Sequence, residues 1–216
     1  IGDKYLFGNY DSCLNLGGIA NISFGKSGST KAFDICGCNI LLNKYSKIYD
    51  KEFDESGKLS SKGKVIPELI ESLNSISYSF IEGPKSLDKE KLLKDNYKLI
   101  DDYLDNKCDI DLKMTGYNVL ATIVEHISNE IFNVVSKQNN LKNILITGGG
   151  AKNIFLIDQI KKKLKCSVII PDEIIVDYKE ALIFAFIGKL RLQNKINCLK
   201  TVTGAKIDHS SGNIFN

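Results

Sequence analysis

The stretch Ile144-Leu-Ile-Thr-Gly-Gly-Gly-Ala-Lys-Asn153 decides the fold. A short apolar strand runs into three glycines, and a helix is expected to begin near Ala151. Bare backbone beside the positive end of a helix suits an anionic or nucleotide ligand. Because Gly148, Gly149 and Gly150 carry no side chains, a ligand can approach the backbone closely. The alternative is a plain tight turn in an α/β domain, since the run matches neither a dinucleotide fingerprint nor a P-loop.

The composition is that of an ordinary globular protein. Of 216 residues, 43% are hydrophobic and 25% charged, which suits one large domain or two small ones with a real core. The net charge of +3 is spread along the chain, so nucleic-acid and membrane-surface partners are not indicated. No apolar run is long enough to span a membrane, and no signal peptide is visible. Six cysteines without a CxxC pair predict buried free thiols in a reducing cytoplasm: Cys13, Cys36, Cys38, Cys108, Cys166 and Cys198.

The chain before the glycine run opens with segments typical of strands. Cys13–Leu16 and Ile19–Phe24 are joined by Gly17-Gly18, a hairpin signal, and a third strand covers Thr30–Ile35. A meander followed by strand–helix units predicts an α/β fold, a mixed sheet with helices on both faces. Helices are expected at 39–48, 65–76, 89–104, 116–135, 153–164 and 177–192, strands at 143–147 and 167–170, a polar lead-in segment at 1–11 and a tail at 197–216.

Three further expectations concern a helical insertion, the helix at 177–192 and His126. Residues 40–113 are mostly a helical insertion. The helix at 177–192 is predicted to be buried, because its residues are largely apolar. His126 is expected at the helix surface or the core edge, with no catalytic role.

The end of the third strand and the first hairpin hold candidate functional residues. A carboxylate at Asp34 can act as a general base, although a turn or cap aspartate reads the same way. Backbone N–H groups near Asn15, Gly17, Gly18 and Asn21 can bind phosphate oxygens, although a simple glycine hairpin is the alternative.

Two further candidates have equally plain alternatives. Glu180 lies in an apolar helix, either buried with a partner or in a solvated first turn. Lys85, in Pro84-Lys85-Ser86, can face an anionic group or simply belong to a loop between helices.

The motifs together resemble the anhydro-N-acetylmuramic acid kinase family of the actin/hexokinase/Hsp70-like ATPase superfamily. Each block alone is weak, whereas their common order along nearly the whole chain is specific. The blocks are Leu14-Asn-Leu-Gly-Gly-Ile-Ala-Asn-Ile-Ser23, Phe33-Asp34 with Asn39, Pro84-Lys-Ser86, Thr147-Gly-Gly-Gly-Ala-Lys-Asn153, Glu180-Ala-Leu-Ile-Phe-Ala185 and Val202-Thr-Gly-Ala205.

The resemblance implies a ribonuclease H-like (actin-like ATPase) lobe and a specific chemistry. The family uses ATP and Mg²⁺ to open the 1,6-anhydro ring of an amino sugar with water and to phosphorylate O6, in cell-wall recycling. Asp34 falls on its general base, and Asn15 to Asn21 fall on a phosphate hairpin. Gly148 to Gly150 fall on its nucleotide glycines, with Asn153 close behind. Glu180 and Lys85 are expected near the sugar.

Two departures from the family pattern keep other hypotheses open. Asp34-Ile-Cys-Gly-Cys-Asn39 stands where Asp-Thr-Gly-Pro-Gly-Asn is common, which leaves a non-catalytic nucleotide- or sugar-binding module as the alternative. No glycine-rich phosphate loop of an amino-terminal lobe is present, so residues 1–216 are expected to be the carboxy-terminal lobe only. An unrelated α/β nucleotide-binding domain is the third hypothesis, and a homodimer stays open.

Overall fold

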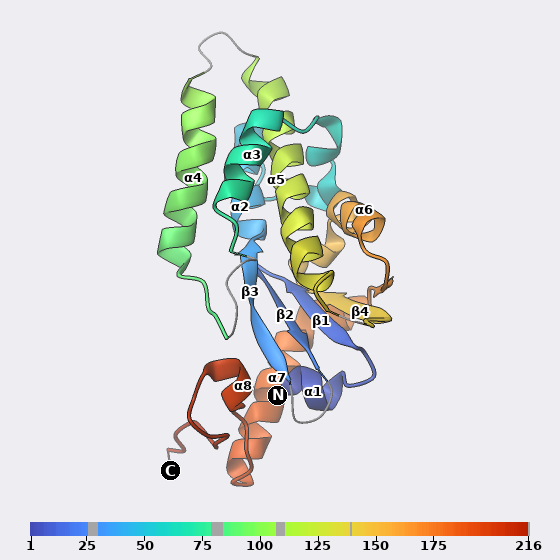
Figure 1. Cartoon of the computed structure of the whole chain (residues 1–216), viewed down its shortest axis with the longest axis vertical. Coiled ribbons are helices and arrows are strands. Elements are labelled where there is room, and N and C mark those ends of the chain that lie inside the picture. The colour runs from blue at the N-terminus through green and yellow to red at the C-terminus, as the bar shows by residue number, and fades with distance from the viewer. Residues whose placement is uncertain (26–29, 79–83, 107–110, 139, 216) are drawn as a thin grey trace.

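The computed structural model describes residues 1–25, 30–78, 84–106, 111–138 and 140–215 (Figure 1). Its centre is a five-stranded sheet of order β3-β2-β1-β4-β5. The strands are β1 (Ser12–Leu16), β2 (Ile19–Phe24), β3 (Lys31–Gly37), β4 (Asn143–Thr147) and β5 (Ser167–Ile169). The β1–β2 and β2–β3 pairs are antiparallel, and the β1–β4 and β4–β5 pairs are parallel. The predicted mixed sheet with an opening meander is therefore confirmed.

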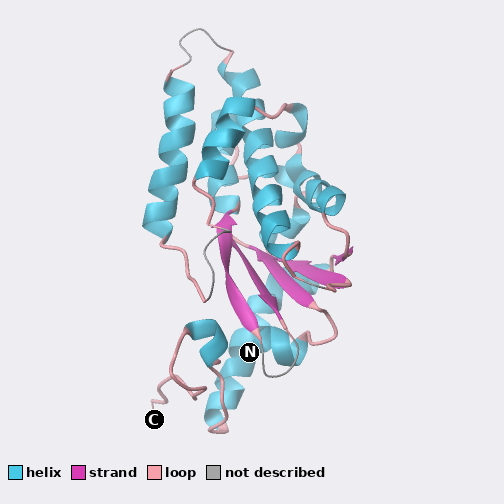
Figure 2. Ribbon diagram, in the orientation of Figure 1, coloured by secondary structure: helices cyan, strands magenta, loops and turns pink. Residues whose placement is uncertain are grey.

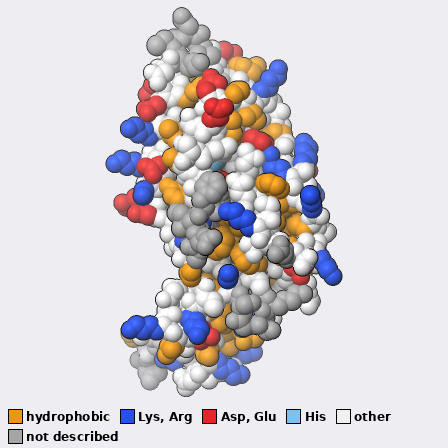
Figure 3. Space-filling model, viewed as in Figure 1, with side chains coloured by type: hydrophobic (Ala, Val, Ile, Leu, Met, Phe, Trp, Pro, Cys, Tyr) orange, Lys and Arg blue, Asp and Glu red, His pale blue; other side chains and the backbone are white. Residues whose placement is uncertain are grey.

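Helices lie on both sides of this sheet, as Figures 1 and 2 show. Helices α2 to α5 stand together on one side, whereas α1, α7 and α8 lie on the other. The α-helices are α1 (Gly2–Leu6), α2 (Asn39–Ser46), α3 (Pro67–Ser75), α4 (Lys89–Asp105), α5 (Leu112–Val135), α6 (Ile154–Lys163), α7 (Glu173–Leu192) and α8 (Lys200–Thr203). On the face shown in Figure 3, basic side chains are spread along both edges with acidic side chains among them.

The core lies between α5 and one face of the sheet. Helix α5 begins where the Asp111 carboxylate accepts hydrogen bonds from the backbone N–H groups of Lys113 and Met114, an N-cap. Its apolar stripe and alternate residues of the central strands belong to one buried cluster, including Leu14, Leu16, Ile22, Ile146, Val119, Ile123 and Ile127. Because side chains alternate along a strand, the intervening residues face α7 instead.

A β-bulge in β3 decides which residue faces α7 there. Ala20 pairs with Cys36, but the next residue, Asn21, pairs with Asp34, so Ile35 is an extra residue in β3. Ile35 is fully buried. A bulge of this kind re-aims the following side chains. Here it brings Asp34 opposite Asn21 on the α7 face.

The prediction that the helix at 177–192 is buried is wrong. Helix α7 begins earlier, at Glu173, and exposes one whole side to solvent, with Ile174 72% and Phe184 71% exposed. The polar lead-in segment is also not what the sequence predicted, because Gly2–Leu6 is helical. Tyr5 packs against Phe186 and Asp3 pairs with Lys179, partners far away in the sequence.

The prediction for His126 is wrong as well. Its side chain is 3% exposed, and Nδ1 lies 3.0 Å from Asn74 Oδ1 of α3. Burial lowers the pKa of His126 to about 4. His126 is therefore a neutral core residue between two helices.

Smaller differences concern helix ends and the tail. A 3-10 turn at Gly149–Lys152 precedes α6, so the α-helix starts at Ile154 rather than Ala151. The tail contains α8 and a bridge between Cys198 and His209. The free thiols of Cys13, Cys36 and Cys38 are buried as predicted, and those of Cys166 and Cys198 are half-buried. Cys108 and most of the turn at 25–29 lie outside the described residues.

Candidate functional site

A row of four polar side chains crosses the α7 face of the sheet. Asp34 pairs with Asn21, Asn21 with Asn15, and Asn15 with Thr147, on β3, β2, β1 and β4 in turn. We call Asp34, Asn21, Asn15 and Thr147 the polar row. Its ends are three strand spacings apart, roughly 14 Å at about 4.8 Å each. The three residues predicted on separate strands are thus brought together, and Thr147, which the sequence analysis did not single out, joins them.

The glycine run begins where the polar row ends, and its three glycines have different roles. Gly148 has φ 83° and ψ 169°, a conformation open essentially to glycine alone. A Cβ on Gly148 would lie 2.5 Å from Asn15 Oδ1, and one on Gly150 would lie 2.6 Å from Leu16 Cβ. These two glycines are therefore required by packing within the chain.

Gly149 differs from its neighbours. It is exposed, and a Cβ there would meet only Asn39 Nδ2, at 3.5 Å. None of the described residues requires a glycine at this position. The absence of a side chain is instead what close approach of a ligand needs.

Asn39 connects the glycine run to β1. Its Nδ2 donates to the carbonyl of Leu16 at 2.9 Å, and it lies beside Gly149 and Gly150. Asn39 is the first residue of α2, and Cys38 precedes it at the N-cap position. The one sequence signal for its importance was its place in the block Asp34–Asn39.

A cavity of about 490 Å³ opens beside this point. Asn39, Phe53, Gly149, Lys152 and Asn153 are among the residues that line it. Phe53 is 59% exposed, so an aromatic face is available to a ligand. Asp34 does not line this cavity.

The first hairpin holds α2 against the sheet. The Gly17 carbonyl accepts from Asn39 N at 3.2 Å, and the Gly18 carbonyl accepts from Cys38 N at 2.8 Å and Ile40 N at 3.2 Å. Neither glycine has positive φ, and a Cβ would come no nearer than 3.5 Å to the chain at Gly17 or 3.9 Å at Gly18. As at Gly149, the chain itself leaves room in front of these residues.

The carboxylate of Asp34 is held by a segment from a distant part of the chain. Asp34 Oδ2 accepts from Leu87 N at 2.9 Å and from Ser86 Oγ at 3.3 Å. The Asp34 N–H donates to the Lys85 carbonyl at 3.2 Å. Among the described residues, no hydrogen bond reaches Oδ1. Hydrogen bonds thus orient one oxygen of this half-buried carboxylate and leave the other without a partner in the described part of the chain.

Comparison with known proteins identifies the family. The family model described as anhydro-N-acetylmuramic acid kinase matches residues 6–216. The chain belongs to the anhydro-N-acetylmuramic acid kinase family. The kinase of that name from Clostridioides difficile is 32% identical over 212 residues, 93% of this chain and 54% of its own length. That from Haemophilus influenzae is 32% identical over 213 residues, 94% of this chain and 56% of its own length.

The chain thus spans about half the length of the curated anhydro-N-acetylmuramic acid kinases it matches. Among solved structures, it is similar to the activator of 2-hydroxyisocaproyl-CoA dehydratase from Clostridium difficile. The TM-score is 0.49 and the identity 16%, over 89% of this chain and 65% of that one.

Two further residues predicted from the resemblance to the anhydro-N-acetylmuramic acid kinase family, Glu180 and Asn153, take part in hydrogen bonds of the fold. Glu180 of α7 is exposed, and its Oε1 accepts from Asn15 Nδ2 at 3.2 Å, which joins α7 to the polar row. Asn153 is 6% exposed and caps α6, its Oδ1 accepting from Leu156 N at 3.0 Å. The Asn153 side chain is therefore partly committed to the fold.

Lys85 is turned away from the polar row. Its Nζ donates to the Tyr78 carbonyl and lies 5.1 Å from the centre of the Phe33 ring. Burial lowers the pKa of Lys85, and the nearby Glu130 carboxylate opposes this effect. Phe33 faces the α5 side of the sheet, so the structure does not bring the Lys85 ammonium together with the glycine run.

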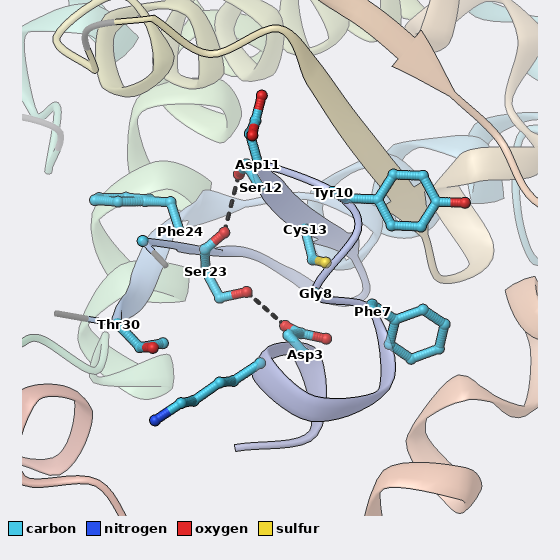
Figure 4. Close-up of a pocket in the computed structure, with 12 residues that line it drawn as sticks. Asp3, Phe7, Gly8, Tyr10, Asp11, Ser12, Cys13, Ser23, Phe24 and Thr30 are labelled. Carbon is cyan, nitrogen blue, oxygen red and sulfur yellow. Dashed lines mark hydrogen bonds between the residues drawn. The ribbon is translucent and has the colours of Figure 1, made fainter. Parts of the chain in front are cut away.

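A second cavity, of about 230 Å³, lies at the opposite ends of β1 and β2 and contains none of the predicted site residues (Figure 4). Asp3 accepts from Ser23 Oγ at 2.6 Å there and pairs with Lys179 at 2.7 Å. Burial raises the pKa of the Cys13 thiol to about 12, so it is a poor nucleophile.

Two absences concern metal ions and membranes, both within the described part of the chain. Within these residues, no three His, Cys, Asp or Glu side chains are grouped to hold a metal ion. None of the described helices is both long and apolar enough to cross a membrane.

Proposed function

We propose that this chain is the lobe of an anhydro-N-acetylmuramic acid kinase that binds the nucleotide phosphates and supplies the general base. The observation that carries the proposal is the polar row, with Asp34 at one end and the glycine run directly after its other end. A distance of roughly 14 Å between them leaves room for phosphates and a sugar on one face of one sheet. Family membership supports the same assignment.

The nucleotide in this proposal is ATP. Its phosphates approach the backbone at Gly149 and in front of Gly17 and Gly18, where added methyl groups would meet little of the chain. Backbone N–H groups at such positions bind phosphate oxygens. The cavity beside Gly149 accepts the rest of the nucleotide, with Phe53 and Lys152 among its lining residues.

Mg²⁺ fits this site as a companion of the phosphates. The described residues offer no cluster of three ligands, whereas Mg²⁺ is commonly held by one or two carboxylates, water and substrate phosphates. Asp34 is the one carboxylate of the polar row and would be the protein ligand available to such an ion there. The ion supplies charge neutralisation on the transferred phosphoryl group when bound.

The reaction assigned to Asp34 is removal of a proton from water. The water oxygen bonds to the anomeric carbon of the 1,6-anhydro amino sugar, and the bond from that carbon to O6 breaks. O6 bonds to the γ-phosphorus of ATP, the bond from that phosphorus to the β–γ bridging oxygen breaks, and ADP leaves. Ser86 and Leu87 hold one carboxylate oxygen, so the other is oriented to accept the proton. Glu180, linked to Asn15, is assigned to the sugar side, whereas Lys85, which is turned away from the polar row, is given no role there.

Phosphoryl transfer needs charge neutralisation and positioning from both sides of a cleft. We assign the second side to an amino-terminal lobe in a cytoplasmic kinase of family length. The 216 residues alone are then expected to show little or no turnover.

The test compares the 216-residue chain with the same reading frame extended to family length, assayed for ATP-dependent phosphorylation of the anhydro-sugar. Asp34→Asn in the longer protein is expected to lower turnover about 10²- to 10⁴-fold, with ATP affinity little changed. Asp105→Asn, at an exposed position on α4, is the control and keeps full turnover. Full activity of Asp34→Asn, or normal turnover by the short chain, refutes the proposal.

A non-catalytic module that binds the same ligands is the second candidate. The segment Asp34–Asn39, which differs from the common family pattern, is filled by buried side chains. Each of Ile35, Cys36 and Cys38 is at most 2% exposed. The same assay separates the candidates, because a binding module takes up ATP at family length without phosphorylating the sugar.

A further inference from the structure

Helix α7 carries a continuous apolar surface that nothing in the described structure covers. Successive residues of an α-helix are rotated by about 100° around its axis, and this places seven apolar or small residues of α7 within an arc of about 120°. We call them the α7 stripe: Ile174, Tyr178, Ala181, Leu182, Ala185, Gly188 and Leu192. All seven are exposed. The large ones are 72% (Ile174), 64% (Tyr178), 43% (Leu182) and 71% (Leu192) exposed.

The opposite side of α7 is packed normally. Val176 and Leu190 are buried, and Lys179 pairs with Asp3 at 2.7 Å. Apolar residues therefore lie on two opposite sides of the helix, a pattern typical of a helix that is covered on both. The described residues cover one of these sides only.

A surface of this kind is unusual for a free-standing protein. A contiguous exposed apolar patch often marks an interaction site, whereas single exposed apolar residues are normal on a protein surface. Lys189 is the charged residue in the same arc, and its long stem can bend its ammonium away from a partner. The middle of the stripe has small residues, Ala181, Ala185 and Gly188, so the backbone of a partner can approach the helix closely there. A Cβ on Gly188 would meet nothing within 4 Å.

The location of the stripe indicates its partner. The curated relatives have 54% and 56% of their length matched by this chain, so nearly half of each lies elsewhere. Ile1 lies beside α7, as Figure 1 shows, because Tyr5 packs on Phe186 with ring centres 5.9 Å apart. Residues preceding Ile1 in a longer polypeptide would start next to α7, on the side opposite to the stripe, and would have to pass around the helix to cover it.

The stripe also borders the candidate site. Glu180, on the flank of α7, bonds to Asn15 of the polar row, and Asp177 pairs with Lys152 of the large cavity at 2.7 Å. A body covering the stripe would therefore lie next to the nucleotide site. From these observations we propose that the α7 stripe is the docking surface for the half of a family-length polypeptide that this sequence does not contain.

The first test measures thermal stability in two lengths of the protein. Ala185→Arg is made in the 216-residue chain and in the same reading frame extended to family length, with Glu71→Arg, exposed on α3, as the control. In the short chain both variants are expected to keep Tm within about 2 °C. In the long form Ala185→Arg lowers Tm by roughly 5 °C or more, because a charge enters a buried interface, and the control does not.

The second test is hydroxyl-radical footprinting read by mass spectrometry. Oxidation of Tyr178 is expected to fall several-fold in the long form, whereas Met114, exposed in the first turn of α5, keeps its reactivity. Equal Tm shifts in both lengths, unchanged oxidation of the stripe, or a reading frame with no extension each overturn the proposal.

A second copy of this chain is the rival occupant, and sedimentation equilibrium decides it. A dimer of the short chain that Ala185→Arg dissociates would assign the stripe to self-association and overturn the proposal. A monomer supports it. All three readouts need neither ATP nor sugar, so failure of the docking surface is distinguishable from failure of the kinase proposal.

Discussion

At the scale of single residues, the glycine run separates into positions required by the fold and a position open to a ligand. Gly148 and Gly150 are confined by Asn15 and Leu16, whereas Gly149 is exposed beside Asn39. The sequence shows three identical letters, so it could not distinguish these roles. The difference depends on φ and on β1, which is more than 130 residues away in the chain.

This distinction predicts that one substitution in the glycine run mainly lowers stability and that its neighbour mainly weakens ATP binding. Gly148→Ala is expected to lower the free energy of unfolding by about 2 to 3 kcal/mol, because alanine is strained at this φ and ψ. Gly149→Ala is expected to change it by less than about 0.5 kcal/mol while weakening ATP binding. Urea denaturation and calorimetric titration measure the two quantities. Equal stability losses would show that Gly149 is also structural.

The buried histidine predicts a dependence of stability on pH. The folded pKa of His126 is about 4, against about 6.5 when unfolded. Below pH 6.5 the unfolded chain therefore gains a proton that the folded chain refuses until about pH 4. The unfolding free energy is expected to fall across this window, by up to about 3 kcal/mol, and to be unaffected by His126 above it.

His126→Gln isolates that contribution, since glutamine stays neutral and can still reach Asn74. The difference in unfolding free energy between the parent and His126→Gln should shift in favour of the variant as pH falls from 6.5 to 4. His209→Gln, in the tail, is the control. A difference that is flat across the window would mean that His126 is not buried in solution.

At the scale of elements, the strands and most helices could be predicted because their patterns are local. The meander, β4 and α5 carry clear alternation or helical spacing. Helix α1 could not be predicted, because what stabilises it is Lys179 and Phe186 of α7. The bulge at Ile35 was equally invisible, because it depends on pairing with β2.

The start of α6 gives a prediction at this scale. Asn153 caps the helix through Leu156 N. Asn153→Ala is expected to cost about 1 kcal/mol of stability, and Asn153→Ser, which can still cap, only a few tenths. Chemical denaturation compares the three proteins. If serine and alanine are equally destabilising, contacts other than the cap explain Asn153.

At the scale of the whole molecule, one side of the sheet carries two features that the described residues leave open. The polar row and the α7 stripe lie on the same side of the sheet, joined through Glu180 and Asn15. The row has one oriented carboxylate and a glycine run, and the stripe has no cover in the described structure. Both features are explained if the other half of a kinase closes over this face.

The central claim is that the glycine run of this chain binds the nucleotide. Titration of the isotopically labelled 216-residue chain with ATP and Mg²⁺, followed by amide NMR, tests it most directly, because weak binding is also visible. The account predicts shifts at Gly149, Gly17 and Gly18 and at the side-chain amide of Asn39, and their loss in Gly149→Val. Shifts confined to the second cavity around Asp3 and Ser23, or no shifts at the glycine run, would contradict it.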